Sequence, residues 1–121
     1  MATLEEGRHA GEFIVSEANG HRSRLQATVL ADEVLEAGQI VGRVTASNKL
    51  RAWNPANIDG SEAVFGVAFA PVDATGGDKQ GVALVRDCEV NGKELVFFEG
   101  ATEGNIETAT LALEGLGIIA R

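Results

Sequence analysis

The stretch from Gly66 to Val90 constrains the fold of this chain more than any other. It reads GVAFAPVDATGGDKQGVALVRDCEV, in which two apolar runs flank a polar segment that contains paired glycines. Glycine adopts positive φ at little steric cost, and aspartate side chains close turns onto the backbone. The pattern therefore predicts two paired strands joined by a hairpin loop.

The first of these runs separates large from small side chains. Successive side chains of a strand point to opposite faces, so the large residues share one face and the small residues share the other. The large face is suited to fill a core, whereas the small face lets another backbone come close. Neither face is polar, so we expect this strand to be covered on both sides. The large residues are Phe65, Val67 and Phe69, and the small ones are Gly66, Ala68 and Ala70.

Length and charge limit the classes of protein to which the chain can belong. Its 121 residues predict one domain, and its 15 glycines have no period, which excludes a collagen-like chain. The net charge of −8 disfavours nucleic acid and anionic membranes as partners. The start of the sequence is polar, without the apolar core of a signal peptide. The single Cys88 leaves no internal disulfide and no CxxC metal site, so we expect a soluble protein made in a reducing cytoplasm.

The remaining segments predict a mainly β protein with one helix. The count of short strands is typical of a small β-barrel or sandwich. Ala31–Gln39 could form one helical turn, and Asn91-Gly92 predicts a tight hairpin. Thr102 or Asn105 can cap the helix, whose apolar face would be Ile106, Ala109, Leu113 and Leu116. The expected strands are Glu12–Ser16, Leu25–Leu30, Ile40–Thr45, Leu50–Trp53, Ser61–Val72, Gly81–Val90, Glu94–Phe98 and Ile118–Ala120, and the helix is Gly100–Leu116.

No catalytic signature is found along the chain. The segment Ala74–Gly81 has glycines and a lysine but lacks the spacing of a phosphate-binding loop and precedes a strand. Asp73 and Asp78 lack the pattern of a calcium loop, so solvated turn carboxylates are the simpler interpretation. Cys88 occupies an alternating strand position and is expected to be an inert thiol, with His9 and His21 far away in sequence. No cofactor, metal or catalytic residue is predicted.

The N-terminal region is the only part that looks separable. Met1–Gly11 is polar and without hydrophobic period, which predicts a flexible arm. The apolar run Glu12–Ser16 lies between polar flanks. It could pair within its own domain, or it could add itself as a strand to the sheet edge of another protein. The residues alone favour pairing within the domain, because chain ends are often tied into sheets.

Several segments, in order along nearly the whole chain, resemble one family. The sequence is similar to the head decoration proteins of tailed bacteriophages, of the lambda protein D type. Each segment alone is weak, but their ordered combination is fairly specific. They are GRHAGEFIVSEANGHRSR (Gly7–Arg24), LEAGQIVGRVT (Leu35–Thr45), KLRAW (Lys49–Trp53), DGSEAVFGVAFAPVDATGGD (Asp59–Asp78), VRDCEVNGKEL (Val85–Leu95) and LGIIAR (Leu116–Arg121).

The resemblance implies a fold and a role that the residue patterns do not give. It implies a small β-clip type domain, or incomplete barrel, over residues 21–121, preceded by a flexible capsid-binding arm over residues 1–20. It also implies a homotrimer on the outer surface of the expanded virion capsid, stabilising the head against DNA pressure. The partner would be the major capsid protein, with no nucleic acid and no membrane. The arm residues in contact with the capsid would be Gly11, Glu12, Phe13, Ile14, Val15, Ser16, Glu17, Ala18, Asn19 and Gly20, which reverses the preference for pairing within the domain.

One departure and two alternatives stand beside this interpretation. Many relatives have Trp-Pro after the strand equivalent to Glu94–Val96, whereas this chain has Phe97-Phe98-Glu99-Gly100, which affects the expected entry to the helix. A small trimeric β-clip enzyme of the dUTPase sort would share the architecture, because a fold alone does not determine function. A generic adaptor module that binds a sheet edge is the third hypothesis. The decoration protein is expected not to be an enzyme.

Overall fold

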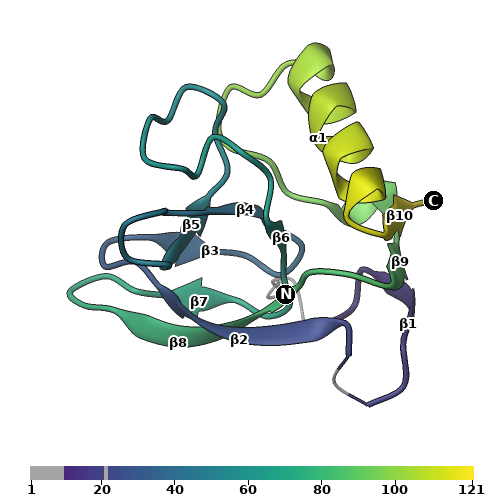
Figure 1. Cartoon of the computed structure of the whole chain (residues 1–121), viewed down its shortest axis with the longest axis horizontal. Coiled ribbons are helices and arrows are strands. Elements are labelled where there is room, and N and C mark those ends of the chain that lie inside the picture. Colours follow the sequence, from purple (N-terminus) through teal and green to yellow (C-terminus); the bar gives the residue numbers. More distant parts are fainter. Residues whose placement is uncertain (1–9, 21) are drawn as a thin grey trace, which may run out of the picture.

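A computed structural model describes residues 10–20 and 22–121 as short strands and one α-helix (Figure 1). The elements are β1 (Ile14–Glu17), β2 (Arg24–Val29), β3 (Val34–Leu35), β4 (Ile40–Arg43), β5 (Leu50–Ala52), β6 (Gly66–Ala68), β7 (Val72–Asp73), β8 (Lys79–Leu84), β9 (Cys88–Val90), a 3-10 turn (Gly92–Glu94), α1 (Glu103–Gly115) and β10 (Ile118–Ala120). This confirms the mainly β class with a single C-terminal helix.

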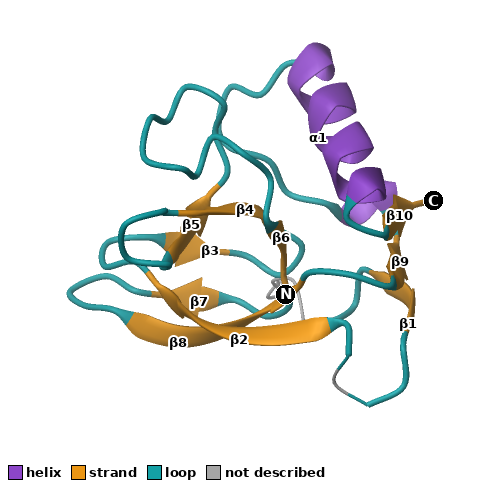
Figure 2. Cartoon of the chain, viewed as in Figure 1, coloured by secondary structure: helices purple, strands orange, loops and turns teal. Residues whose placement is uncertain are grey.

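Five strands form a closed barrel in the order β2-β5-β4-β6-β8 (Figure 2). The longest pairing joins β2 and β8, antiparallel over six residue pairs from Arg24↔Leu84 to Val29↔Lys79. The barrel is closed by a single parallel pairing, Val29↔Leu50, between β2 and β5. A strand that is paired on both sides offers no backbone groups to a further strand, but residues 24–28 of β2 are paired only with β8. The two-residue strands β3 and β7 form a separate small sheet.

The predicted pairing of the two apolar runs is confirmed, but the predicted strand Gly81–Val90 is divided, because β8 lies in the barrel and β9 lies in a different sheet. Strands β6 and β8 are antiparallel, with Val67 opposite Leu84 and Ala68 opposite Ala83. Both faces of β6 are covered, because Val67 belongs to one core cluster and Ala68 to the other. The small face does admit a backbone, since a Cβ on Gly66 would lie 2.3 Å from the carbonyl oxygen of Leu84.

A second, open sheet lies beside the barrel and contains the first and last strands of the described chain. Its order is β1-β9-β10, with β9 antiparallel to β1 and parallel to β10. Figure 1 shows this sheet next to the lower end of α1, with the C-terminus close by. Unlike the barrel, it has two outer strands, β1 and β10. These are where another chain could pair with the backbone.

The predicted helix is confirmed with somewhat narrower bounds. Thr102 is its N-cap: the Thr102 hydroxyl accepts the Asn105 N–H, and the Asn105 side chain accepts the Thr102 N–H in return. This is the reciprocal arrangement of a capping box. Of the predicted apolar face, Ala109 and Leu113 are fully buried, whereas Ile106 and Leu116 are more than a third exposed.

Three local predictions are wrong. Asn91-Gly92 does not form a tight hairpin, because Asn91 has φ −81° and its side chain instead accepts the Lys93 N–H and begins the 3-10 turn. The predicted strand Glu94–Phe98 is then reduced to one isolated bridge, Gln39↔Val96. Ala31–Gln39 contains β3 rather than a helical turn, since Asp32 has φ +72° and Val34–Leu35 pairs with β7.

Two hydrophobic clusters fill the interior. One lies between barrel, open sheet and helix, and includes the lone tryptophan, Trp53, whose indole N–H donates to the carbonyl of Glu62 at 2.8 Å. The other lies inside the barrel. Cys88 is buried in the first cluster, as the strand pattern predicts. The other fully buried large residues of the first cluster are Phe13, Ile40, Val67, Leu84, Val90, Leu113 and Ile118. Those of the cluster inside the barrel include Val29, Leu35, Val41 and Leu50.

Candidate docking segment

The ten residues from Gly11 to Gly20, here called the docking segment, are packed against the domain in the single chain. The Gly11 N–H donates to the carbonyl of Phe69 at 2.9 Å. Phe13 is only 1% exposed, and its carbonyl accepts the Asn91 N–H at 2.8 Å. The part of the expected arm that is described is therefore joined to the domain through a core side chain, whereas residues 1–9 lie outside the described residues.

Strand β1 forms one outer edge of the open sheet. It pairs with β9 through Ile14↔Val90, Ser16↔Glu89 and Glu17↔Cys88, with a register irregularity at Val15. Val15 is 56% exposed. Bulges of this kind bend a strand and re-aim a side chain. Among the described residues no strand pairs with the other side of β1, so the segment presents an open backbone edge and an exposed apolar side chain together.

Side-chain hydrogen bonds fasten β1 to its neighbour. The Ser16 hydroxyl donates to Oε2 of Glu89 at 2.7 Å, and Nε of Arg121 donates to Oε1 of the same carboxylate at 2.8 Å. The Ser16 hydrogen bond and then the Arg121 guanidinium lower the pKa of Glu89 below its usual value. A residue of β1, a residue of β9 and the residue that follows β10 are thus joined across the sheet.

The turn after β1 is held at its base and open at its tip. The Ala18 N–H points at the carbonyl of Asp87, at 3.2 Å, and at the hydroxyl oxygen of Ser23, at 3.0 Å. The buried Ser23 hydroxyl donates to the same Asp87 carbonyl at 2.8 Å. Asn19 and Gly20, between these anchors, are exposed.

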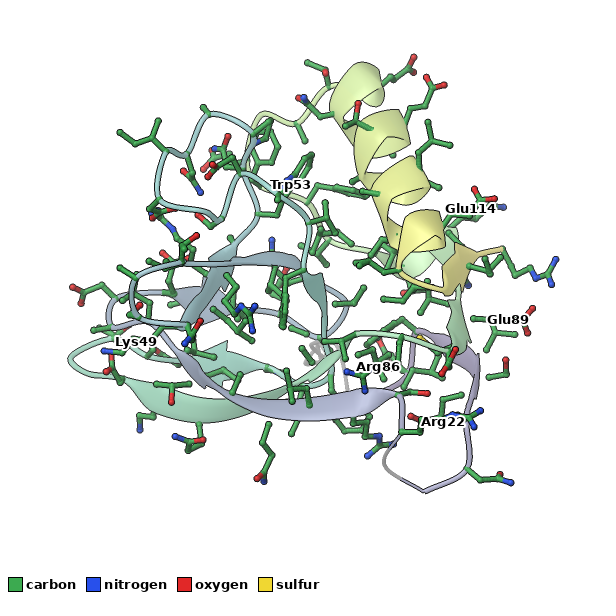
Figure 3. All side chains as sticks on the ribbon, viewed as in Figure 1. Arg22, Lys49, Trp53, Arg86, Glu89 and Glu114 are labelled. Carbon is green, nitrogen blue, oxygen red and sulfur yellow. The ribbon has the colours of Figure 1, made fainter. Side chains whose placement is uncertain are left out.

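Arginines gather at this end of the molecule. Arg24 binds both carboxylate oxygens of Glu17, at 2.5 and 3.0 Å, and lies over the Phe69 ring. This hydrogen bond raises the pKa of Arg24. Arg22 pairs with Asp87 at 3.3 Å, and Arg86 donates to the carbonyl of Arg22 at 2.7 Å. Figure 3 shows Arg22 and Arg86 beside the turn that joins β1 to β2.

The helix side of the molecule has the opposite character. From residue 94 to residue 120 the sequence contains five glutamates and no lysine or arginine. Glu103, Glu107 and Glu114 are exposed on α1. Charge is therefore distributed unevenly. Acidic and basic groups pair around the docking segment, whereas the charged residues of α1 are all glutamates.

Comparison with known proteins decides the family. A family model described as bacteriophage lambda head decoration protein D matches residues 3–118, nearly the whole chain. The chain belongs to this family. It is thus a phage head decoration protein that associates with the capsid and is located in the virion, and the family is structural rather than enzymatic. No match is found among curated proteins.

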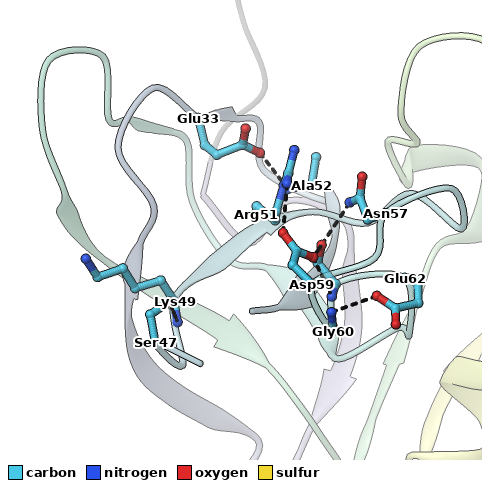
Figure 4. A network of polar contacts seen from close by, with 10 residues as sticks. Glu33, Ser47, Lys49, Arg51, Ala52, Asn57, Asp59, Gly60 and Glu62 are labelled. Carbon is cyan, nitrogen blue, oxygen red and sulfur yellow. Dashed lines mark hydrogen bonds and ion pairs between the residues drawn. The ribbon is translucent and has the colours of Figure 1, made fainter. Parts of the chain in front are cut away.

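A second polar cluster of the decoration protein holds the loop between β5 and β6 (Figure 4). The Asp59 carboxylate accepts the Ser61 N–H at 3.0 Å and the Nη1 of Arg51 at 2.9 Å. The Ser61 hydrogen bonds, followed by Arg51, lower the pKa of Asp59 to about 2. The carbonyl of Asp59 also accepts the Thr45 N–H at 2.9 Å. These contacts fix a loop whose tip residue, Ile58, is 97% exposed.

The described part of the chain, residues 10–20 and 22–121, contains one cysteine and no histidine. No group of three or more metal-ligating side chains is found there. Burial raises the pKa of Cys88 to about 11, so its thiol is not a ready nucleophile. His9 and His21 lie outside the described residues. None of the described helices has the length and apolar character needed to cross a membrane.

Proposed function

We propose that this chain binds as trimers to the outer surface of the expanded phage head, with the docking segment as the main contact to the major capsid protein. Bound there, it stabilises the shell against the pressure of packaged DNA. The observation that supports this proposal most directly is the open edge of β1, with Val15 exposed at its bulge. A strand of the shell can add to this edge by backbone hydrogen bonding.

The strength of such binding depends on the number of linked segments. One backbone hydrogen bond contributes a net ~0.5–1.5 kcal/mol, so a single short strand binds weakly. Three docking segments on one trimer act together, because linkage can raise avidity by ~10²–10⁴ without new contacts. A trimer therefore binds firmly where three acceptor sites are correctly spaced. A lattice that reaches this spacing only on expansion makes attachment conditional on maturation.

The distribution of charge favours one orientation on the shell. The acidic helix α1 would repel an acidic partner, whereas the charges around the docking segment are balanced by Arg22, Arg24 and Arg86. We therefore place α1 away from the shell and the β1 edge against it. In this arrangement residues 1–20 form the capsid-binding part and residues 21–121 the decoration domain.

The experiment compares two valines of nearly equal exposure. Val15 is 56% exposed on β1, and Val34 is 59% exposed on β3, which belongs to a different sheet. Deletion of residues 1–20 would remove the buried Phe13, so substitution at the surface is the sharper test. Val15→Asp and Val34→Asp are each sedimented with DNA-free shells before and after expansion, alongside the unmodified protein.

We expect the unmodified protein and Val34→Asp to bind expanded shells only. Val15→Asp should bind about tenfold more weakly or worse, because it places a charge on the docking edge. Equal binding by both variants would move the contact away from β1, and binding to unexpanded shells would contradict the dependence on maturation. Sedimentation equilibrium of the free protein tests the trimer separately.

A further inference from the structure

We propose that Asn19 is a site of spontaneous deamidation in the folded protein, and that Asn91 is protected from the same reaction. Both are followed by glycine, at Gly20 and Gly92. The sequence thus contains two copies of one reactive dipeptide. The two dipeptides differ in exposure and in the hydrogen bonds that they make, and this difference predicts which asparagine reacts.

The reaction needs only the chain and water. The backbone nitrogen of the glycine loses its proton to solvent and attacks Cγ of the asparagine side chain. The new C–N bond closes a five-membered succinimide, while the Cγ–Nδ2 bond breaks and ammonia leaves. Water then opens the ring at either carbonyl, giving aspartate or isoaspartate. Nothing is oxidised or reduced, and one amide is exchanged for one carboxyl group.

Asn19 and Gly20 are free to reach the reactive geometry. Both are exposed, in the turn between β1 and β2. The described chain provides no hydrogen-bond partner for the Asn19 side chain or the Gly20 N–H. A Cβ on Gly20 would meet nothing within 4 Å, so the space beside its Cα is open. Glycine also lets the backbone rotate through conformations that other residues avoid.

Asn91 and Gly92 are held in place at both reacting atoms. The Gly92 N–H, which must act as the nucleophile, donates to the carbonyl of Arg121 at 3.1 Å. The Asn91 side-chain oxygen accepts the Lys93 N–H at 3.0 Å, which orients Cγ toward the 3-10 turn. The Asn91 N–H is bonded to the carbonyl of Phe13. Ring closure would require these hydrogen bonds to open first.

Deamidation would change the docking segment. It adds a negative charge at position 19, one residue after Ala18, whose N–H points at the carbonyl of Asp87, and an isoaspartate would also lengthen the backbone of the turn. An aged protein would then bind the shell differently from a fresh one. This consequence rests on the proposed function, whereas the reaction itself does not.

The test measures amide loss at the two sites in one sample. The folded protein is incubated in mildly alkaline buffer below its melting temperature, then digested with trypsin, which separates position 19 from position 91 by cleavage at Arg22 and Arg86. Mass spectrometry of the two peptides gives the rate at each site. We expect loss at Asn19 to be about tenfold faster or more, because hydrogen bonds must first open at Asn91.

A parallel incubation in concentrated denaturant supplies the control. There the two rates should become nearly equal, since the hydrogen bonds around Asn91 are gone. Asn91 reacting as fast as Asn19 in the folded protein would overturn the proposal, as would a large difference that persists after unfolding. Asn19→Asp, assayed for shell binding, tests the consequence for docking, and its failure would leave the measured rates valid.

Discussion

The barrel has strands of three to six residues and the open sheet has strands of three or four, and the two differ in which strand edges they leave unpaired. The five barrel strands close on themselves, and β6 is covered on both faces. The open sheet ends in β1 and β10, and it includes the irregular pairing at Val15. A strand that is paired on both sides cannot accept a further strand, whereas an outer strand such as β1 has one side available for pairing. The comparison suggests that the barrel provides the scaffold and the sheet provides the contact.

The largest expected effect comes from the residue that joins the two regions. Phe13 precedes β1 and is packed with Trp53 and barrel residues in one cluster. We expect Phe13→Ala to reduce the free energy of unfolding by about 3–5 kcal/mol, from the lost burial and the cavity left behind. Denaturant unfolding followed by Trp53 fluorescence measures this change.

Val15→Ala is the control for Phe13→Ala, because Val15 is exposed on the same segment and should cost little. A small loss from Phe13→Ala would mean that the sheet is attached loosely and that the barrel is stable without it. That result would contradict the description of the open sheet as part of the folded domain, because β1 would then be a loosely attached arm and not an edge strand.

A smaller effect is expected inside the barrel. In Gly66→Ala the new methyl group would meet the carbonyl oxygen of Leu84 at 2.3 Å, so the pairing of β6 with β8 must shift. We expect a loss of about 1–3 kcal/mol, measured by the same unfolding experiment. Gly77→Ala is the matched control, because a Cβ there meets nothing within 4 Å. Equal stability of the two variants would show that the barrel is less tightly packed than the pairing indicates.

The smallest effect concerns the loop that leaves the barrel after β5. The pKa of Asp59 is lowered from 3.8 to about 2 in the folded protein, so its carboxylate stabilises the fold above 3.8 and this stabilisation is lost as pH falls toward 2. Asp59→Asn should therefore reduce the fall in melting temperature over this interval. An unchanged fall would assign the acid sensitivity to Asp73, Asp78 and Glu89, whose pKa values are also lowered.

Local patterns account for the parts of the fold that could be predicted. The alternation of large and small residues around Val67 predicted a doubly covered strand, and Thr102 predicted the start of α1. The hairpin at Asn91-Gly92 was mispredicted because the asparagine side chain satisfies the Lys93 N–H and a 3-10 turn competes with the hairpin. Backbone propensity alone does not decide such a competition.

Contacts between distant segments could not be predicted in the same way. The barrel closes through one pair, Val29↔Leu50, for which no sequence pattern gives a signal. The docking segment was indicated by resemblance to a family, and the residues themselves favoured pairing within the domain. That pairing, β1 with β9, is present in the single chain. Which side of β1 stays open depends on its pairing with β9, so it is visible only in the folded arrangement.

The pairing in the open sheet also determines when this sheet can form during synthesis of the chain. Ser16 bonds to a residue 73 positions later, and β10 joins β9 only once residues 118–120 exist. A ribosome delivers the N-terminal part first, so β1 waits for its partner until most of the chain has been made. The surface proposed to dock can thus form only after residue 90 has been made, which is later than the last barrel strand, β8, at residues 79–84.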